Sequence, residues 1–302
     1  MTFLTVLLTL FVERFVQRQR PKREHRWFDR YCRRLAGVPF VQWLMTRPWG
    51  SVAILLPPLL LIAWLQTLFN DLGGLFGLIF GVVILLYSLG PRELGEEVES
   101  YLSARNRGDE GQANSIANEF CPGAAPDSEP QRSYAVARTL VVAACRRLVA
   151  PIFWFVVFGA VGAAAYRAIQ LLAERLQCTG CPDEMQRHCD EMRHITDWAP
   201  ARITAAGYAI AGNFDAVTHA WQTFDYVPDT DQIDEAERLL AKTGLAALDT
   251  YPNEAEVLDG ELTGADAGLL PPVIEDALAL VWRSLAMWLA IVAAGSLVAA
   301  LA

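Results

Sequence analysis

Four long runs of apolar residues constrain this chain more than any other feature of its sequence. They cover residues 51–69, 73–90, 148–165 and 284–302, and none of them contains a charged side chain. The hydrocarbon core of a bilayer is about 30 Å thick, so a helix that crosses it needs about 20 apolar residues. Since 53% of all residues are hydrophobic and the mean hydropathy is +0.25, the sequence predicts an all-α polytopic membrane protein. We expect about four transmembrane helices together with interfacial and extramembrane helices.

The apolar runs divide the chain into six regions. Residues 51–90 are predicted to form a transmembrane hairpin, because only three residues separate its two runs. The short run 2–12 is followed rather than preceded by basic residues, which favours an interfacial or partly inserted helix over a signal peptide. The other predicted regions are an interfacial helix with a basic cytoplasmic segment (1–50), a cytoplasmic loop (91–147), transmembrane helix 3 (148–167), an acidic extramembrane region (168–277) and transmembrane helix 4 (278–302).

Charge is distributed unevenly along the chain, whose net charge is -9. Residues 13–47 hold ten Lys or Arg against three acids, which gives +7, and residues 168–277 hold six bases against twenty-one acids, which gives -15. Short basic segments beside transmembrane helices stay in the cytoplasm. The pattern therefore predicts a multi-pass membrane protein with the basic segment in the cytoplasm and the acidic region on the far side. A basic island beside an apolar run indicates contact with the lipid bilayer, and we expect no nucleic-acid partner.

The densest group of potential metal ligands lies in the acidic region. Cys178 and Cys181 have the Cys-x2-Cys spacing, and His188, Cys189 and His194 follow them. Thiolates and imidazoles at such positions are ligands that zinc prefers. A disulfide from Cys189 to Cys178 or Cys181 is the alternative in an oxidising compartment, and thiols without a role are a third interpretation.

Polar residues next to the apolar runs form the second candidate site. Arg167 follows the third run, and Asp197 and Arg202 flank Pro200. Burying such groups near a membrane is costly, so they often have a function. We expect either an ion pair that orients the turn at 196–203 or a binding site for an anionic small ligand. We expect no cofactor, because the chain has neither a phosphate-binding loop nor a hydrolase or metalloprotease motif.

Several motifs give the chain a family resemblance. They are VAPIFW at 149–154, AYRAI at 165–169 and DWAPARIT at 197–204. Together they resemble the superfamily that contains the AmpE proteins and the adenosylcobinamide-phosphate synthases of cobalamin assembly. LLTLFVER at 7–14, the basic segment 25–34 and YLSAR at 101–105 look specifically like AmpE. The resemblance implies a multi-pass protein of the bacterial inner membrane. It also implies a signalling role in β-lactamase induction, linked to cell-wall recycling, with a cell-wall-recycling amidase as partner.

The synthase branch carries an acidic, amide-bearing motif just before Ala-Pro-x-Phe-Trp, and this chain departs from it. Val142 and Ala143 occupy the positions of its Glu and Asn, and Arg146 and Arg147 those of its Asp and Gly. ATP-dependent amide formation would need acidic residues to hold magnesium. We therefore expect a non-enzymatic accessory or sensor protein, a pseudo-enzyme that is able to form oligomers. The alternatives are an altered amide-forming synthase and a membrane scaffold that docks a cytoplasmic partner through 91–147.

Overall fold

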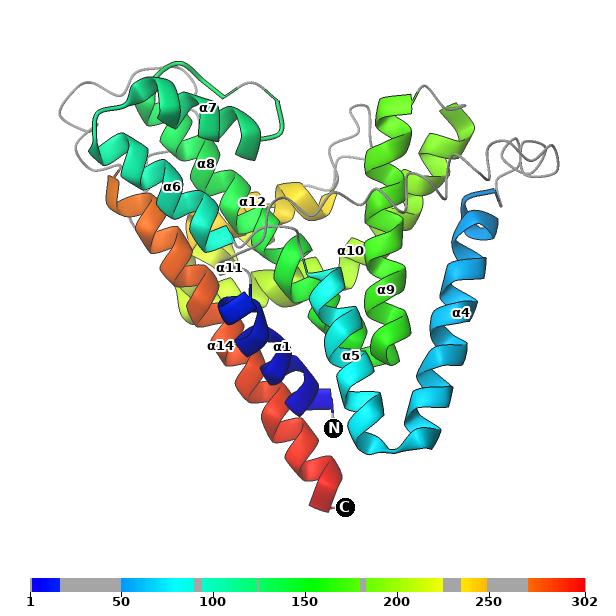
Figure 1. The fold of residues 1–302 in the computed structure, drawn as a ribbon. Helices are drawn as coiled ribbons and strands as arrows, with labels where there is room; N and C mark the ends of the chain where they lie inside the picture. The colour runs from blue at the N-terminus through cyan, green and yellow to red at the C-terminus, as the bar shows by residue number, and fades with distance from the viewer. Residues whose placement is uncertain are drawn as a thin grey trace. The chain divides into compact units, whose positions relative to one another are not determined.

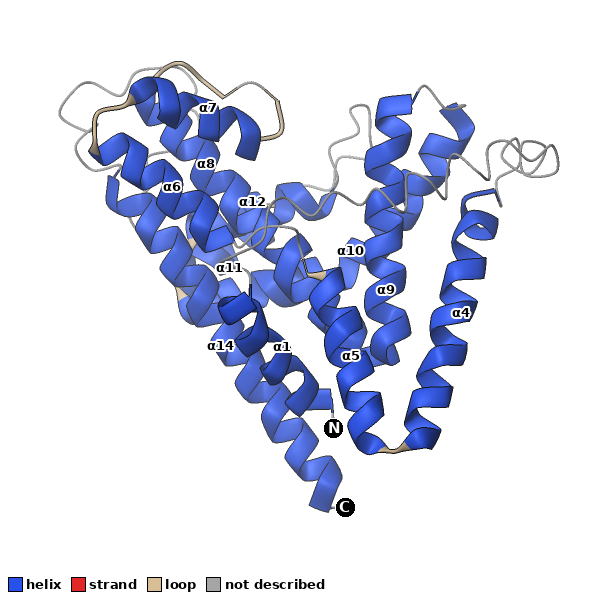
Figure 2. Ribbon diagram, in the orientation of Figure 1, coloured by secondary structure: helices blue, strands red, loops and turns tan. Residues whose placement is uncertain are grey.

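The protein is all-α, as the sequence predicts. A computed structural model describes residues 2–16, 50–89, 94–123, 125–179, 183–224, 235–248 and 271–301, and within these ranges it contains helices and no strand (Figures 1 and 2). Most of the basic segment 13–47 and most of the polar stretch 249–272 lie outside the described residues. The chain divides into two compact units. The first comprises Met1–Pro91, Arg147–Ala199 and Gly295–Ala302, and the second Arg92–Arg146 and Pro200–Ala294.

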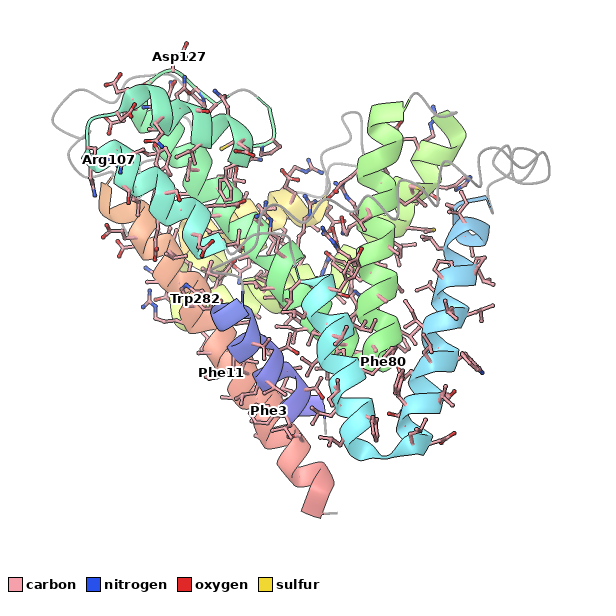
Figure 3. All side chains as sticks on the ribbon, in the orientation of Figure 1. Phe3, Phe11, Phe80, Arg107, Asp127 and Trp282 are labelled. Atoms are coloured by element: carbon pink, nitrogen blue, oxygen red, sulfur yellow. The ribbon has the colours of Figure 1, made fainter. Side chains whose placement is uncertain are left out.

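The first unit is built from the helices that carry most of the apolar sequence. Helices α4 (Gly50–Leu72) and α5 (Gly74–Ser88) form the predicted hairpin, and both pack against α9 (Ala150–Thr179) (Figure 1). Phe80, labelled in Figure 3, stacks on Phe69 across the hairpin with ring centroids 5.2 Å apart. Helix α1 (Thr2–Val16) contacts α5 and α9, and buries Thr5, Val6 and Thr9 on one face. Its other face exposes apolar side chains such as that of Phe11, which suits an interface with lipid.

The second unit contains the helices of the more polar sequence. Helices α6 (Leu94–Asn106), α7 (Glu110–Phe120) and α8 (Glu129–Ala144) pack together, and α11 (Phe214–Gln222) packs on α12 (Glu235–Ala246). Helix α10 (Asp183–Ala211) and helix α14 (Pro271–Leu301) each have residues in both units. A π-helical turn, η2 (Cys145–Val149), connects α8 to α9. The hydroxyl of Tyr208 donates to the carbonyl oxygen of Val141 at 2.7 Å, just before this turn.

Three stretches of helix are long and apolar enough to cross a membrane, within the described part of the chain. They are Gly50–Leu72, Gln131–Glu174 and Ile274–Ser296, and they overlap three of the four predicted spans. The predicted span 73–90 corresponds to α5, which has 15 residues. At 1.5 Å per residue this helix is about 22 Å long, shorter than the bilayer core. The structure thus supports a membrane protein with several apolar helices, and the count of four crossings stays a prediction.

Helix α8 packs directly against α12, which the predicted topology does not accommodate. Gly244 of α12 makes this approach close, since a Cβ atom at that position would lie 2.8 Å from Cβ of Val141. Arg146 also forms an ion pair with Glu237 at 3.1 Å. The sequence placed α8 in the loop 91–147 and α12 in the acidic region 168–277, on opposite faces of the membrane. The structure brings together two helices that the prediction separates, because a charge count along the chain does not register helix packing. The assignment of membrane faces stays a prediction.

Candidate functional site

A group of buried, hydrogen-bonded polar side chains in the first unit centres on Asp197. Its carboxylate oxygen Oδ1 accepts hydrogen bonds from the hydroxyl of Tyr166 at 2.7 Å and from Nε2 of Gln170 at 3.0 Å. Asp197 is 2% exposed, and Tyr166 and Gln170 are also buried. Tyr166 and Gln170 are four residues apart on α9, so they lie on the same face of that helix. The cluster therefore ties α9 to α10 through one buried carboxylate.

A proline next to this cluster explains a second contact between α9 and α10. Pro200 lies inside α10 and has no N–H group, so the carbonyl oxygen of Thr196 lacks its usual helical donor. The indole nitrogen Nε1 of Trp154 donates to that oxygen at 3.0 Å. Trp154 and Pro200 come from two of the family motifs identified in the sequence. The hydrogen bond from Trp154 to Thr196 therefore holds α10 against α9 at the residue just before Asp197.

Helix α9 is broken in the middle of the predicted third span. Gly159 has φ 68° and ψ −153°, a conformation that residues with a side chain rarely adopt. The break frees backbone groups, and Oε1 of Gln66 on α4 accepts from the backbone nitrogen of Val161 at 3.2 Å. The expectation of one continuous helix over 148–165 is therefore wrong. In apolar surroundings a broken helix needs such a substitute partner for its backbone.

The break turns the second half of α9 back toward its beginning. Arg167 interacts electrostatically with Arg147, although twenty residues separate them. In a straight helix that separation would place them about 30 Å apart. Consistent with a sharp turn, a Cβ atom on Gly162 would collide with the backbone oxygen of Trp154. Arg167 also interacts electrostatically with Tyr87 of α5, with Tyr166 and with Glu174.

Arg167, Asp197 and Arg202 have different surroundings in the structure, and a shared ligand site stays a prediction. Asp197 is held by Tyr166 and Gln170, as described above. Arg202 forms an ion pair with Glu235 of α12 at 2.8 Å within the second unit. Arg167 is 9% exposed, and its Nε has no hydrogen-bond partner among the described residues. The structure thus separates a bonded carboxylate, a paired arginine and a buried guanidinium that retains an open donor.

The predicted metal or disulfide group lies partly outside the described residues. Nothing is described of the Cys178 side chain or of Cys181. Cys189 is buried in an apolar cluster with residues of α4 and α9. Nδ1 of His188 lies 3.3 Å from a carboxylate oxygen of Glu191, and His194 is half-buried. No three His, Cys, Asp or Glu side chains form a potential metal site in the part of the chain that the structure describes, and the zinc and disulfide interpretations stay predictions.

The positions that correspond to the synthase motif have other tasks in this structure. Val142 is buried and apolar, and Arg146 is paired with Glu237. Cys145, between them, lies in the π-helical turn beside the buried Tyr208. Burial raises the pKa of Tyr208 well above its ordinary value, and Cys145 adds to the shift. These residues hold α8, α10 and α12 together.

Two contributing residues were missed in the sequence. Gln66 is an amide within the otherwise apolar run 51–69, and polar residues inside apolar helices usually have a structural or functional reason. That signal was sufficient to single out Gln66. Tyr87 lies near the end of the next apolar run, where a tyrosine is an ordinary interfacial residue. No pattern in the sequence connects it with Arg167.

Comparisons with known proteins agree with the sequence motifs. Residues 1–246 match the model of a family described as "Regulatory signalling modulator protein AmpE". The cobalamin biosynthesis protein CobD of Stutzerimonas stutzeri (strain A1501) is 27% identical over 308 residues, which cover 97% of this chain and 97% of that protein. Protein AmpE of Shigella flexneri is 28% identical over 234 residues, which cover 73% of this chain and 78% of that protein. No solved structure matches.

Proposed function

This chain belongs to the AmpE family, and from that premise we propose that it modulates β-lactamase induction in response to cell-wall recycling. It is a membrane protein of a family described as regulatory. In this role it acts in the bacterial inner membrane without catalysing a reaction, as a pseudo-enzyme. Its partner is a cell-wall-recycling amidase, or a protein that responds to the products of such an enzyme.

The observation that supports this proposal most strongly is which residues occupy the positions aligned with the synthase motif, and what they contact. Magnesium-dependent chemistry on ATP needs carboxylates that are free to hold the metal. Val142 is buried, Arg146 is engaged with Glu237, and the buried carboxylate of Asp197 is bonded to Tyr166 and Gln170. This arrangement favours a structural scaffold over a catalytic one.

A regulatory protein needs an element with two arrangements that a ligand distinguishes. The broken helix α9 suits this task, because its two halves meet at Gly159 and only a side-chain bond from Gln66 secures the amide of Val161. Through η2, α9 continues into α8. A change at the break therefore has a short covalent path to the helices of the second unit.

Genetic complementation tests the regulatory role. A strain with an inducible chromosomal β-lactamase and a deletion of its own AmpE protein would be supplied with this chain or with an empty vector. We expect the chain to change the ratio of induced to basal β-lactamase activity, and the Gln66→Leu variant, at equal protein level, to change it less. Equal ratios for chain and vector would refute the proposal.

The relative from cobalamin biosynthesis supports a second candidate function. Its similarity extends over nearly the whole chain, so an altered amide-forming synthase is the alternative. In that case the chain would restore cobalamin-dependent growth to a strain that lacks adenosylcobinamide-phosphate synthase. We expect no growth, and growth above the empty vector would favour the enzyme.

A further inference from the structure

The contacts between α9 and α4 show where the chain goes after the break at Gly159. Just beyond the break, the backbone nitrogen of Val161 donates to Oε1 of Gln66 at 3.2 Å. Further along α9, Leu172 shares a buried apolar cluster with Leu55, near the beginning of α4. The two helices lie side by side in Figure 1. The second half of α9 therefore runs antiparallel to α4, back toward the residue at which α4 begins.

The first half of α10 lies at the same end of α4. The hydroxyl of Ser51, the second residue of α4, donates to Sδ of Met192 at 3.6 Å. A helix that crossed the membrane once over 148–165 would lead the following residues to the other end of α4, where Asp71 lies next to the hairpin turn. The contact of Met192 with Ser51 is instead expected if the chain returns to the side on which α4 begins.

The reversal of α9 is sharp and lies within apolar sequence. A Cβ atom on Gly162 would collide with the backbone oxygen of Trp154, although eight residues of straight helix would separate the two positions by about 12 Å. Residues 155–163 around the turn contain no polar side chain, whereas Asn70 and Asp71 precede the turn between α4 and α5. The hairpin turn thus has side chains that suit a water interface, and the turn of α9 has none.

The turn of α9 also stops short of the turn between α4 and α5. Gln66, which accepts from the Val161 amide, lies six residues before the last residue of α4, which corresponds to about 9 Å of helix. On α5, a Cβ atom on Gly81 would lie 3.3 Å from Cζ of Phe155. Gly81 is seven residues from the first residue of α5, or about 10 Å. The turn of α9 therefore lies beside the apolar interior of the hairpin.

We propose that α9 is a re-entrant hairpin, which enters the bilayer, turns at Gly159 among the acyl chains and leaves on the side from which it entered. Val157 and Phe158, which are 50% and 60% exposed, contact lipid at the turn. Irregular backbone is tolerated at this depth where protein covers it, and Gly162 is buried. Because the basic segment precedes α4, the side on which α4 begins is the cytoplasm. The first half of α10 is then cytoplasmic.

The charge pattern predicts the far side for this part of the chain, and there is a physical reason not to rely on it. The rule that keeps basic loops in the cytoplasm applies to segments of up to about 60 residues, and acidic residues contribute little to it. Region 168–277 is longer, and its charge comes mainly from acids. The contact of α8 with α12 in the second unit also agrees with one shared side. The re-entrant hairpin does not depend on any role in β-lactamase induction.

Cysteine labelling of the full-length protein tests this topology. The variants Arg187→Cys and Glu191→Cys each introduce one thiol at an exposed position of α10, in a chain whose six native cysteines are replaced by alanine. Gln112→Cys in α7 is the control for the cytoplasmic side, and Asp71→Cys beside the hairpin turn is the control for the far side. Both control positions are exposed. A membrane-impermeant maleimide is applied to right-side-out and to inside-out membrane vesicles.

We expect Arg187→Cys and Glu191→Cys to be labelled in inside-out vesicles only, together with Gln112→Cys. Asp71→Cys should be labelled in right-side-out vesicles only. If the two α10 variants are labelled together with Asp71→Cys instead, α9 crosses the membrane once and the proposal is wrong. Either α10 position decides the matter if the other variant fails to accumulate in the membrane.

The depth of the turn is tested by a second measurement. A spin label on Val157→Cys should collide more often with oxygen, which dissolves in hydrocarbon, than with a water-soluble nickel chelate. The same label on Asp71→Cys should show the opposite preference, because this residue is exposed beside the hairpin turn. A preference for the nickel chelate at both positions would place the turn of α9 in water and would overturn the re-entrant hairpin.

Discussion

The two units of the molecule connect their helices with different polar contacts. In the second unit Arg105, Arg146 and Arg202 pair with Glu129, Glu237 and Glu235 at 2.6, 3.1 and 2.8 Å. In the first unit the buried carboxylate of Asp197 accepts hydrogen bonds from the neutral side chains of Tyr166 and Gln170. Ion pairs thus connect helices of the second unit, whereas hydrogen bonds to one buried carboxylate connect α9 to α10 in the first.

This difference determines what each substitution removes. Breaking an ion pair near the surface costs little because solvent screens the charges, whereas removing a buried acceptor leaves its donors unsatisfied. The sequence grouped Arg167 with Arg202 because both lie next to apolar runs. The structure distinguishes them, because Arg202 is paired with Glu235 and Nε of Arg167 has no hydrogen-bond partner among the described residues.

The largest expected effect concerns the bonded carboxylate of the first unit. Asp197→Ala removes the acceptor of the buried Tyr166 hydroxyl and the buried Gln170 amide. Each donor left without an acceptor costs about 1–3 kcal/mol in the free energy of unfolding. We expect a loss of roughly 3 kcal/mol in the free energy of unfolding, measured by reversible denaturation in mixed micelles. Asp197→Asn keeps an acceptor and should lose less. Equal losses for the two variants would show that the hydrogen bonds are not the cause.

The break in α9 should give the next largest effect. Gly159→Ala places a Cβ atom at positive φ and 3.0 Å from Nε2 of Gln66. We expect about 1–3 kcal/mol of destabilisation in the same assay. Gly95→Ala is the matched control, because it has an open position in α6 with no atom within 4 Å of the new Cβ. A tolerated Gly159→Ala would mean that α9 runs straight through this residue.

Tyr208 provides a smaller, pH-dependent test in the second unit. Tyr208→Phe removes the hydrogen bond to the Val141 carbonyl and should cost about 1 kcal/mol at neutral pH. Burial raises the pKa of Tyr208 in the folded protein, so the unfolded phenol ionises first, near pH 10. The wild type should therefore lose stability relative to Tyr208→Phe as the pH rises above about 10. A difference between the two proteins that stays constant from pH 8 to 11 would contradict this.

The smallest effect is expected for an ion pair near the surface. Glu129, the partner of Arg105, is half exposed in its side chain. Such pairs contribute about 0–1 kcal/mol, because solvent screens them. Arg105→Gln should therefore change the free energy of unfolding by less than Tyr208→Phe does. A larger loss would indicate that the AmpE-like segment 101–105 has a role beyond this pair.

Local patterns predicted the elements of this fold better than their arrangement. Apolar runs located α4, α5 and α14, because hydrophobic periodicity is a property of neighbouring residues. The break at Gly159 was missed because glycine is common in apolar helices. The positive φ of this glycine and the bond to Gln66 of another helix became visible only in the structure. The contact of α8 with α12 was missed because it joins residues that lie far apart in the sequence. For the site, the residue types of Arg167 and Asp197 were enough to single them out in the sequence. The residues that contact them could be identified only from the fold.

The central claim is that α9 breaks and turns back at Gly159. Spin labels attached at 147 and 167 in an otherwise cysteine-free protein test it directly, through the distance measured by pulsed electron paramagnetic resonance. A turned helix predicts a distance well below the roughly 30 Å that twenty residues of straight helix would span. A narrow distribution near or above 30 Å would contradict the break.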